Sequence, residues 1–189
     1  QVCFKWWRFH TFFVSLHLGD DIGYRRDTSS LNQTTPKAMR RTLDISYEHY
    51  ASLDELSSED RSLVQEAQEA TATANAPYSH FHVGAAVRLK SGRTLHASNF
   101  ESEVYPAGLC AERSLLFYVE ANYKDDHIES LAIASDPSER ECYPCGACRQ
   151  VMLDAERRQQ SPIRIVMAGG GTATTVESAE SLLPFTFRL

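Results

Sequence analysis

The chain has 189 residues, a formal charge of −6 and a pI of about 5.6. This length allows one domain with a substantial core, and 42% hydrophobic with 23% charged residues is ordinary for a globular protein. Domains that bind nucleic acid usually carry a basic face, so the acidic balance argues against a polynucleotide as the main partner. No apolar run long enough to predict a membrane span occurs. A small, nearly neutral substrate is compatible with these properties.

The N-terminal part of the sequence differs in pattern from the rest. Residues 1–18 place two basic residues before a short apolar patch, which crudely resembles a signal peptide. Polar side chains interrupt that patch, however, and no small-x-small cleavage site follows it. Residues 19–43 are polar and aperiodic, as in a linker. We therefore expect residues 1–43 to be a poorly ordered N-terminal extension and residues 44–189 to form the folded domain.

An amphipathic helix is the first long element that the periodicity predicts in this domain. Before it, the alternating residues 43–50 are compatible with either an edge strand or a docking arm. Ser58 is a plausible N-cap, with acidic residues in the following turn. Apolar residues then recur at helical spacing over residues 59–74. The helix should end before Pro77, because the residue before a proline avoids helical angles.

Strands and helices alternate along the remaining chain. Residues 83–89 and 94–99 are predicted to form a hairpin around the Ser91-Gly92 turn. Strands separated by helices indicate a crossover sheet covered by helices. The prediction is an α/β fold: a three-layer α/β/α domain with a mixed central sheet of about five strands. The later elements that we expect are a helix over 110–123, a strand over 130–135, a loop and helix over 144–158, and strands over 163–167 and 174–177.

The cysteines are unevenly distributed. Of five in the chain, Cys142, Cys145 and Cys148 fall within seven residues. Disulfide scaffolds usually have even numbers of dispersed cysteines, so this crowding favours metal binding in a reducing compartment. A catalytic zinc site uses three protein ligands and leaves a fourth position for water. Cys110 and the Cys145-x-x-Cys148 pair supply three thiolates, so we predict one Zn²⁺ per subunit.

Cys142 is the alternative ligand, because Cys142-x-x-Cys145 has the same spacing. Two observations favour Cys145 with Cys148. Pro144 is a good neighbour for the start of a helix, and Cys148 then lies one turn after Cys145. Cys142 precedes the proline and falls in the loop. The preferred ligands lie at predicted helix N-termini, where exposed N–H groups and the helix dipole favour thiolates.

Glu112 is the candidate proton carrier. It lies two residues after Cys110 on the first turn of a predicted helix, so its carboxylate can face the open position of the metal. The plainer alternative is a solvated glutamate that interacts with the helix dipole. Three thiolates on Zn²⁺ leave an excess negative charge, and Arg113 is positioned to offset it as a supporting residue.

These motifs, in this order, resemble the cytidine deaminase family. The deaminase signature has a His or Cys before x-Glu and a P-C-x-x-C segment downstream, and this chain has the all-cysteine version. The resemblance covers residues from about 46 to 187. The segments that carry it are residues 76–86, Asn99-Phe100-Glu101, residues 105–113, residues 144–150 and residues 182–187.

The resemblance implies roles for residues away from the metal. Phe81 would pack against the pyrimidine and the ribose. Asn99 and Glu101 would hydrogen-bond the ribose 3′-hydroxyl, and an amide with a carboxylate satisfies both functions of a hydroxyl. The Ala111 backbone, together with Glu112, would recognise the amide edge of the base.

The resemblance also implies a homotetramer with shared active sites. Tyr105 and Phe187 would be contributed to the sites of neighbouring subunits. The short, all-cysteine members of the family have this assembly. The implied partners are a small nucleoside and other copies of the chain, with neither nucleic acid nor membrane.

The expected activity is zinc-dependent hydrolytic deamination of free cytidine and deoxycytidine to uridine and deoxyuridine, in cytoplasmic pyrimidine salvage. Glu112 would pass a proton from water to the ring nitrogen and then to the departing ammonia. One alternative is a related cytosine nucleoside, such as a blasticidin-type antibiotic. Polynucleotide cytosines fit poorly, because their 3′-oxygen is esterified and cannot donate to the clamp. The remaining alternative is a non-enzymic protein with a structural zinc, which needs a fourth ligand such as Cys142.

Overall fold

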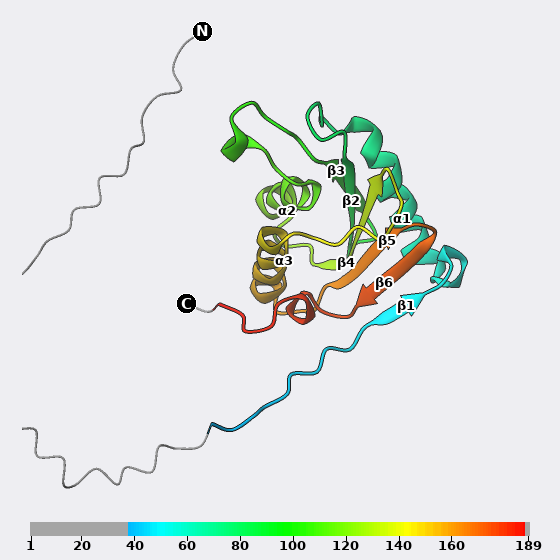
Figure 1. The fold of residues 1–189 in the computed structure, drawn as a ribbon. Helices are drawn as coiled ribbons and strands as arrows, with labels where there is room; N and C mark the ends of the chain where they lie inside the picture. Colours follow the sequence, from blue (N-terminus) through cyan, green and yellow to red (C-terminus); the bar gives the residue numbers. More distant parts are fainter. Residues whose placement is uncertain (1–37, 188–189) are drawn as a thin grey trace, which may run out of the picture. The chain divides into compact units, whose positions relative to one another are not determined.

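The computed structural model describes residues 38–187. Most of the extension predicted for residues 1–43 lies outside these residues, and that prediction stays open. The described chain folds as a mixed β-sheet with helices on both faces (Figure 1). Within residues 38–187, no helix is both long enough and apolar enough to span a membrane.

The sheet has six strands in the order β1-β6-β5-β4-β2-β3, one more than expected. The additional strand is β1 (Glu48–Tyr50), which pairs antiparallel with β6 and settles the choice for this segment in favour of an edge strand. Its three residues are polar or aromatic and mostly exposed, so its hydrophobic pattern is weak. β4 and β5 are parallel, which makes the sheet mixed as predicted. The other strands are β2 (His82–Leu89), β3 (Thr94–Ser98), β4 (Ile128–Asp136), β5 (Arg164–Gly169) and β6 (Thr172–Val176).

In the described part of the chain, three α-helices cover the sheet: α1 (Ser58–Ala70), α2 (Ala111–Asn122) and α3 (Gly146–Gln159). The predicted N-cap of α1 was wrong by one residue. Ser57 is the cap, and its hydroxyl accepts a hydrogen bond from the Asp60 amide at 3.0 Å. An N-cap side chain accepts from the amide two or three residues later, and Ser57 stands in that relation to Asp60.

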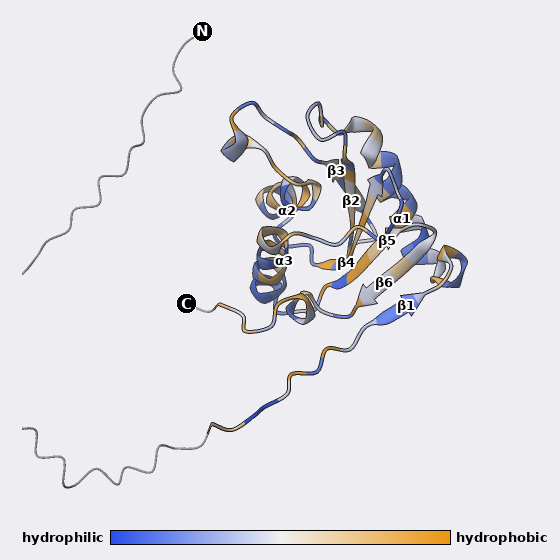
Figure 2. Ribbon diagram, viewed as in Figure 1, coloured by the Kyte–Doolittle hydropathy of each residue, from blue (hydrophilic) through white to orange (hydrophobic). Residues whose placement is uncertain are grey.

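The helices divide into two layers, so the three-layer prediction is confirmed. Alternate residues of β4 face opposite sides: Leu131 and Ile133 lie in the core with α2 and α3, whereas Ala132 and Ala134 lie in the core with α1. Figure 2 shows hydrophobic residues in the central strand β5, whereas the edge strand β1 is hydrophilic. The helix α1 lies very close to the sheet at Gly84. A Cβ atom at this position would come within 1.9 Å of a backbone oxygen of α1, so only glycine allows this approach.

The direction of the strands determines where the two helices α2 and α3 begin. β3 and β4 both pair antiparallel with β2, so they run the same way and finish at the end of the sheet where β2 starts. The chain passes from β3 toward α2 and from β4 toward α3. The N-termini of both helices therefore lie near this end of the sheet. The β2–β3 turn, with Gly92 at φ +85°, lies at the opposite end.

Candidate active site

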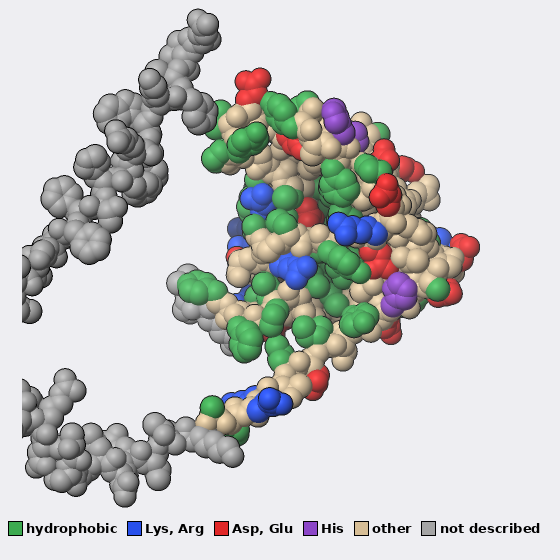
Figure 3. All heavy atoms as spheres, viewed as in Figure 1, with side chains coloured by type: hydrophobic (Ala, Val, Ile, Leu, Met, Phe, Trp, Pro, Cys, Tyr) green, Lys and Arg blue, Asp and Glu red, His purple; other side chains and the backbone are tan. Residues whose placement is uncertain are grey.

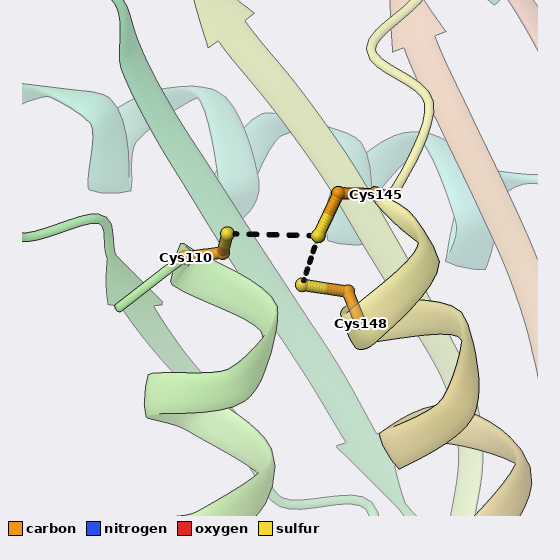
Figure 4. A group of neighbouring side chains, drawn as sticks. All are labelled: Cys110, Cys145 and Cys148. Atoms are coloured by element: carbon orange, nitrogen blue, oxygen red, sulfur yellow. Dashed lines mark hydrogen bonds between the residues drawn. The ribbon is translucent and has the colours of Figure 1, made fainter. Parts of the chain in front are cut away.

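Three thiols converge where α2 and α3 begin (Figure 4). Cys110 is the N-cap residue of α2, Cys145 is the N-cap residue of α3, and Cys148 lies in the first turn of α3. The Sγ atoms of Cys110 and Cys145 are 3.9 Å apart, and those of Cys145 and Cys148 are 3.4 Å apart. The predicted ligand set is thus brought together by two helices that share one end of the sheet.

This donor set fits zinc. Thiolates about 2.3 Å from a tetrahedral zinc ion are about 3.8 Å from one another, close to the measured S···S distances of 3.4 and 3.9 Å. All three Sγ atoms lie within 4.8 Å of each other, and within residues 38–187 no other group of three or more His, Cys, Asp or Glu side chains could hold a metal ion. Three protein ligands leave one position of the tetrahedron for water or substrate, as in a catalytic site.

Cys142 does not join this group of thiols. Burial raises the pKa of the Cys142 thiol to about 11. In contrast, a hydrogen bond with Cys148, supported by the Arg113 guanidinium, lowers the pKa of Cys110 to about 5. The structural-zinc alternative therefore lacks its only suggested fourth ligand.

Arg113 contacts the thiol cluster directly. Its Nη2 atom lies 3.6 Å from Cys110 Sγ. A guanidinium at this distance offsets part of the negative charge that three thiolates bring together. This is the contact that the supporting role requires, and the effect of Arg113 on activity stays a prediction.

Glu112 is a buried carboxylate beside the thiols. It is 3% exposed, although it lies in the first turn of α2. Burial raises its pKa, and the negative charge of Cys110 adds to this effect. A solvated glutamate that serves only the helix dipole would be exposed, so the plainer alternative does not fit. A buried carboxylate with a raised pKa is suited to take up and release a proton.

A cleft of about 700 Å³ opens above Glu112 and the thiols. It has a metal end, lined by Cys110, Glu112 and Cys145, and a second end, lined by the loop that precedes β2 and by the residues that follow β3. This volume lies within the range of pockets for small molecules. The remaining residues of its lining include Tyr78, Ser79, Phe81, Val83, Asn99, Phe100, Glu101, Ser102, Tyr105, Arg113, Cys142 and Tyr143.

Three of the predicted substrate contacts line this cleft: Phe81, Asn99 and Glu101. Tyr105, which was predicted to serve the site of a neighbouring subunit, lines the cleft of its own chain. Ala111 is fully buried in the first turn of α2. Phe187 lies outside the cleft and is 67% exposed, and its carbonyl accepts a hydrogen bond from Arg157 at 3.0 Å.

Asn99 and Glu101 already have partners within the protein. Asn99 Oδ1 accepts from the Val83 amide at 2.8 Å, and its Nδ2 donates to the Phe81 carbonyl at 3.0 Å. Glu101 accepts from the Tyr78 and Ser79 amides at 2.9 and 3.2 Å, and from the Ser79 hydroxyl. These hydrogen bonds lower the pKa of Glu101, and the bond from the Ser79 hydroxyl has the largest effect. Both side chains therefore hold the loop that carries Phe81.

Ser79 and Tyr143 are among the residues of the site that were not predicted from the sequence. Ser79 binds Glu101, and Tyr143 lines the metal end of the cleft. Ser79 belongs to the segment 76–86 that carried the family resemblance, which was a usable signal. Tyr143 had no such signal except its place two residues before Cys145.

The family is shown by comparison with known proteins. Residues 57–161 match the family model described as the cytidine and deoxycytidylate deaminase zinc-binding region. The chain belongs to this family of zinc-dependent hydrolases.

Individual relatives agree with this assignment. The cytidine deaminase of Halalkalibacterium halodurans is 40% identical over 92 residues, which are 49% of this chain and 68% of the relative. The blasticidin-S deaminase of Bacillus cereus is 30% identical over 128 residues, covering 65% of this chain and 89% of that protein. The crystal structure of cytidine deaminase from Burkholderia pseudomallei superposes with a TM-score of 0.59 at 32% identity, over 70% of this chain and all of that one. The predicted family and fold class are confirmed.

Proposed function

We propose that this enzyme deaminates free cytidine and deoxycytidine, giving uridine or deoxyuridine and ammonia, in pyrimidine salvage. One observation carries the proposal: a buried Glu112 stands beside three converging thiols at one end of a cleft, and Asn99 and Glu101 line the same cleft. The metal end of the cleft has the groups that hydrolysis of an amidine needs. The other end has the polar groups that binding of a ribose needs.

Glu112 moves the protons in this reaction. Zn²⁺, when bound by Cys110, Cys145 and Cys148, supplies a Lewis acid that makes water nucleophilic. The Glu112 carboxylate accepts a proton from the attacking water and delivers it to N3 of the base. It then carries the second proton of that water, taken from the new hydroxyl on C4, to the 4-amino group, which leaves as ammonia while the C4 carbonyl forms. Water and cytidine thus give uridine and ammonia, with the carboxylate restored. Its raised pKa helps it hold the proton between the two transfers.

The second end of the cleft favours a free nucleoside. An ionised Glu101 accepts a hydrogen bond from a 3′-hydroxyl, and the Asn99 amide has a second N–H beyond the one given to Phe81. A polynucleotide has no free 3′-hydroxyl at internal positions and cannot make this contact. The net charge of −6 also opposes binding of a polyanion.

A homotetramer with shared sites is part of the proposal. Figure 3 shows many hydrophobic side chains on the viewed face. Tyr105 and Phe187 are 82% and 67% exposed, and Phe185 is 95% exposed. Aromatic rings at such positions are suited to packing against other subunits. Free thiols also suit the reducing cytoplasm, which we propose as the location.

The test is a set of parallel assays on the purified zinc protein, following the loss of cytosine absorbance. Cytidine, deoxycytidine, a cytosine oligonucleotide and blasticidin S serve as substrates, and Glu112→Gln serves as the inactive control. We expect turnover of the two nucleosides and none of the oligonucleotide. The relative from Bacillus cereus favours a second candidate, deamination of blasticidin S. Turnover of blasticidin S without cytidine would replace the proposal with that candidate.

A further inference from the structure

A second cavity, of about 580 Å³, adjoins the active-site cleft. The two spaces share three lining residues: Phe81, Cys142 and Tyr143. Since each of these residues borders both cavities, they lie where the two spaces meet. Phe81 and Tyr143 are the two large side chains among them, and they come from different loops, one before β2 and one before α3.

A hydrogen bond from its hydroxyl group fixes the side chain of Tyr143. Its hydroxyl donates a hydrogen bond of 2.6 Å to Glu141 Oε2. The side chain of Glu141 is only 6% exposed, and its other oxygen accepts from Thr172 of β6 at 2.8 Å and lies 3.2 Å from His49 Nδ1 of β1. The ring of Tyr143 is therefore anchored through one buried carboxylate to two strands of the sheet.

Glu141 is suited to this anchoring role because it stays ionised. Burial opposes its charge, but hydrogen bonds from Thr174, Tyr143 and Thr172 outweigh burial and lower its pKa. A charged acceptor strengthens the bond from the tyrosine hydroxyl. Tyr143 therefore keeps a strong hydrogen bond to a buried partner although it is 56% exposed.

The position of Tyr143 along the cleft determines what it can contact. It precedes the ligand Cys145 by two residues, and both residues line the cleft, so the backbone of Tyr143 lies near the metal end. The residues suited to the ribose lie on the segments around Ser79 and Glu101. A ring at the metal end faces substituents of the base rather than those of the sugar.

Building on the proposed function, we propose that Tyr143 is a specificity-determining residue whose ring closes the metal end of the cleft against the adjoining cavity and so limits the size of substituents on the pyrimidine. Removal of the ring would join the two cavities. Cytidines with a bulky group at position 5 would then gain room, whereas changes to the sugar would be unaffected.

The experiment compares Tyr143→Ala with the wild-type enzyme on cytidine, 5-iodocytidine and cytosine arabinoside. We expect the ratio of kcat/KM for 5-iodocytidine over cytidine to rise by about tenfold or more, a size typical of apolar pocket contacts. The ratio for the arabinoside over cytidine should not change. Tyr118→Ala is the matched control, because Tyr118 is similarly exposed, at 51%, and lines neither cavity. An unchanged 5-iodocytidine ratio, or an equal rise for the arabinoside, would overturn the proposal.

Two further measurements keep the test decisive. Tyr143→Leu replaces the alanine variant if that protein does not fold, with the same change expected in smaller measure. Calorimetric binding of uridine and 5-iodouridine gives the comparison without turnover. If the wild type binds these nucleosides but does not deaminate cytidine, the proposed function fails, and the change in relative affinity on removing the ring still decides the role of Tyr143.

Discussion

The two ends of the cleft are formed at the same end of the sheet, but they hold their polar groups in different ways. At the metal end, three thiols face one another, and Glu112 is buried beside them. At the other end, Asn99 and Glu101 are bonded to the backbone of the loop that carries Phe81.

This difference separates two ways of preparing a site. The metal end depends on local helix geometry, because each ligand is at or near the first residue of a helix. The other end depends on a loop kept in place by Asn99 and Glu101, the side chains that we propose also bind the substrate. Substitutions at the metal end should therefore affect metal content and chemistry, whereas those at the other end should affect substrate affinity and loop order.

The largest effect is expected when a thiol is removed. Cys148→Ser should abolish activity and lower zinc content from one equivalent per chain to near none, because two thiolates hold zinc far less tightly than three. Cys142→Ser is the matched control, and it should keep its zinc because Cys142 lies outside the cluster. Metal analysis of both proteins tests the assignment, and loss of zinc from Cys142→Ser would contradict it.

Glu112→Gln should separate chemistry from metal binding. The amide keeps the shape of the side chain but cannot carry a proton, so kcat should fall by about 10²–10⁴-fold, the contribution of a general acid–base. Zinc content should stay at the wild-type value. A variant that holds zinc and still deaminates at the wild-type rate would rule out the proposed role.

Glu101→Gln should weaken the other end of the cleft. A hydrogen bond to a charged group contributes about 1.5–3 kcal/mol, which corresponds to a fall of about ten- to hundredfold in kcat/KM for cytidine. Ser79→Ala loses the anchor of Glu101 but not the carboxylate, so its defect should be smaller and mainly in KM. Equal defects in the two variants would indicate that Glu101 acts only on the loop.

Arg113→Ala should have a more modest effect at the metal end. Loss of its contact with Cys110 Sγ, at 3.6 Å, removes the cation that offsets the thiolate charge. We expect activity to fall by about two- to tenfold, the size of one net hydrogen bond of ~0.5–1.5 kcal/mol. Zinc should be retained, and unchanged turnover would remove Arg113 from the supporting role.

The smallest effect concerns stability in acid. The folded-state pKa of Glu101 is below its ordinary value of 4.5, so the unfolded chain takes up a proton first as the pH falls. The stabilisation by this group is complete above about pH 4.5 and is lost as the pH falls through the lower, folded value. Glu101→Gln should therefore show a shallower decrease of Tm with acid than the wild type. Parallel curves for the two proteins would show that these hydrogen bonds add no stability.

The sequence was most informative where function depends on local geometry. Cys145 and Cys148 are one helical turn apart, so their spacing alone predicted that both thiols could bind one metal. The placement of Cys110 beside them needed the strand order, which brings α2 and α3 to one end of the sheet. The sequence did not decide between an edge strand and a docking arm for the segment that contains β1, because the few residues of β1 are mostly exposed and lack a hydrophobic pattern.

Contacts between distant residues set the limit of such prediction. The bond from Ser79 to Glu101 joins residues 22 apart, and Thr172 reaches Glu141 across 31 residues. Periodicity and spacing carry no information on pairings of this kind. The resemblance to the family supplied Phe81, Asn99 and Glu101 as substrate contacts, but not the hydrogen bonds through which they order the loop.

The turn between β2 and β3 is remote from the candidate active site. It lies at the opposite end of the sheet from the thiols, and a Cβ atom at Gly92 would meet nothing within 4 Å. Exposed loop tips of this kind tolerate inserted sequence well. A short peptide tag placed between Ser91 and Gly92 would give a handle for attaching the enzyme to a solid support at a point remote from the thiols of the same chain.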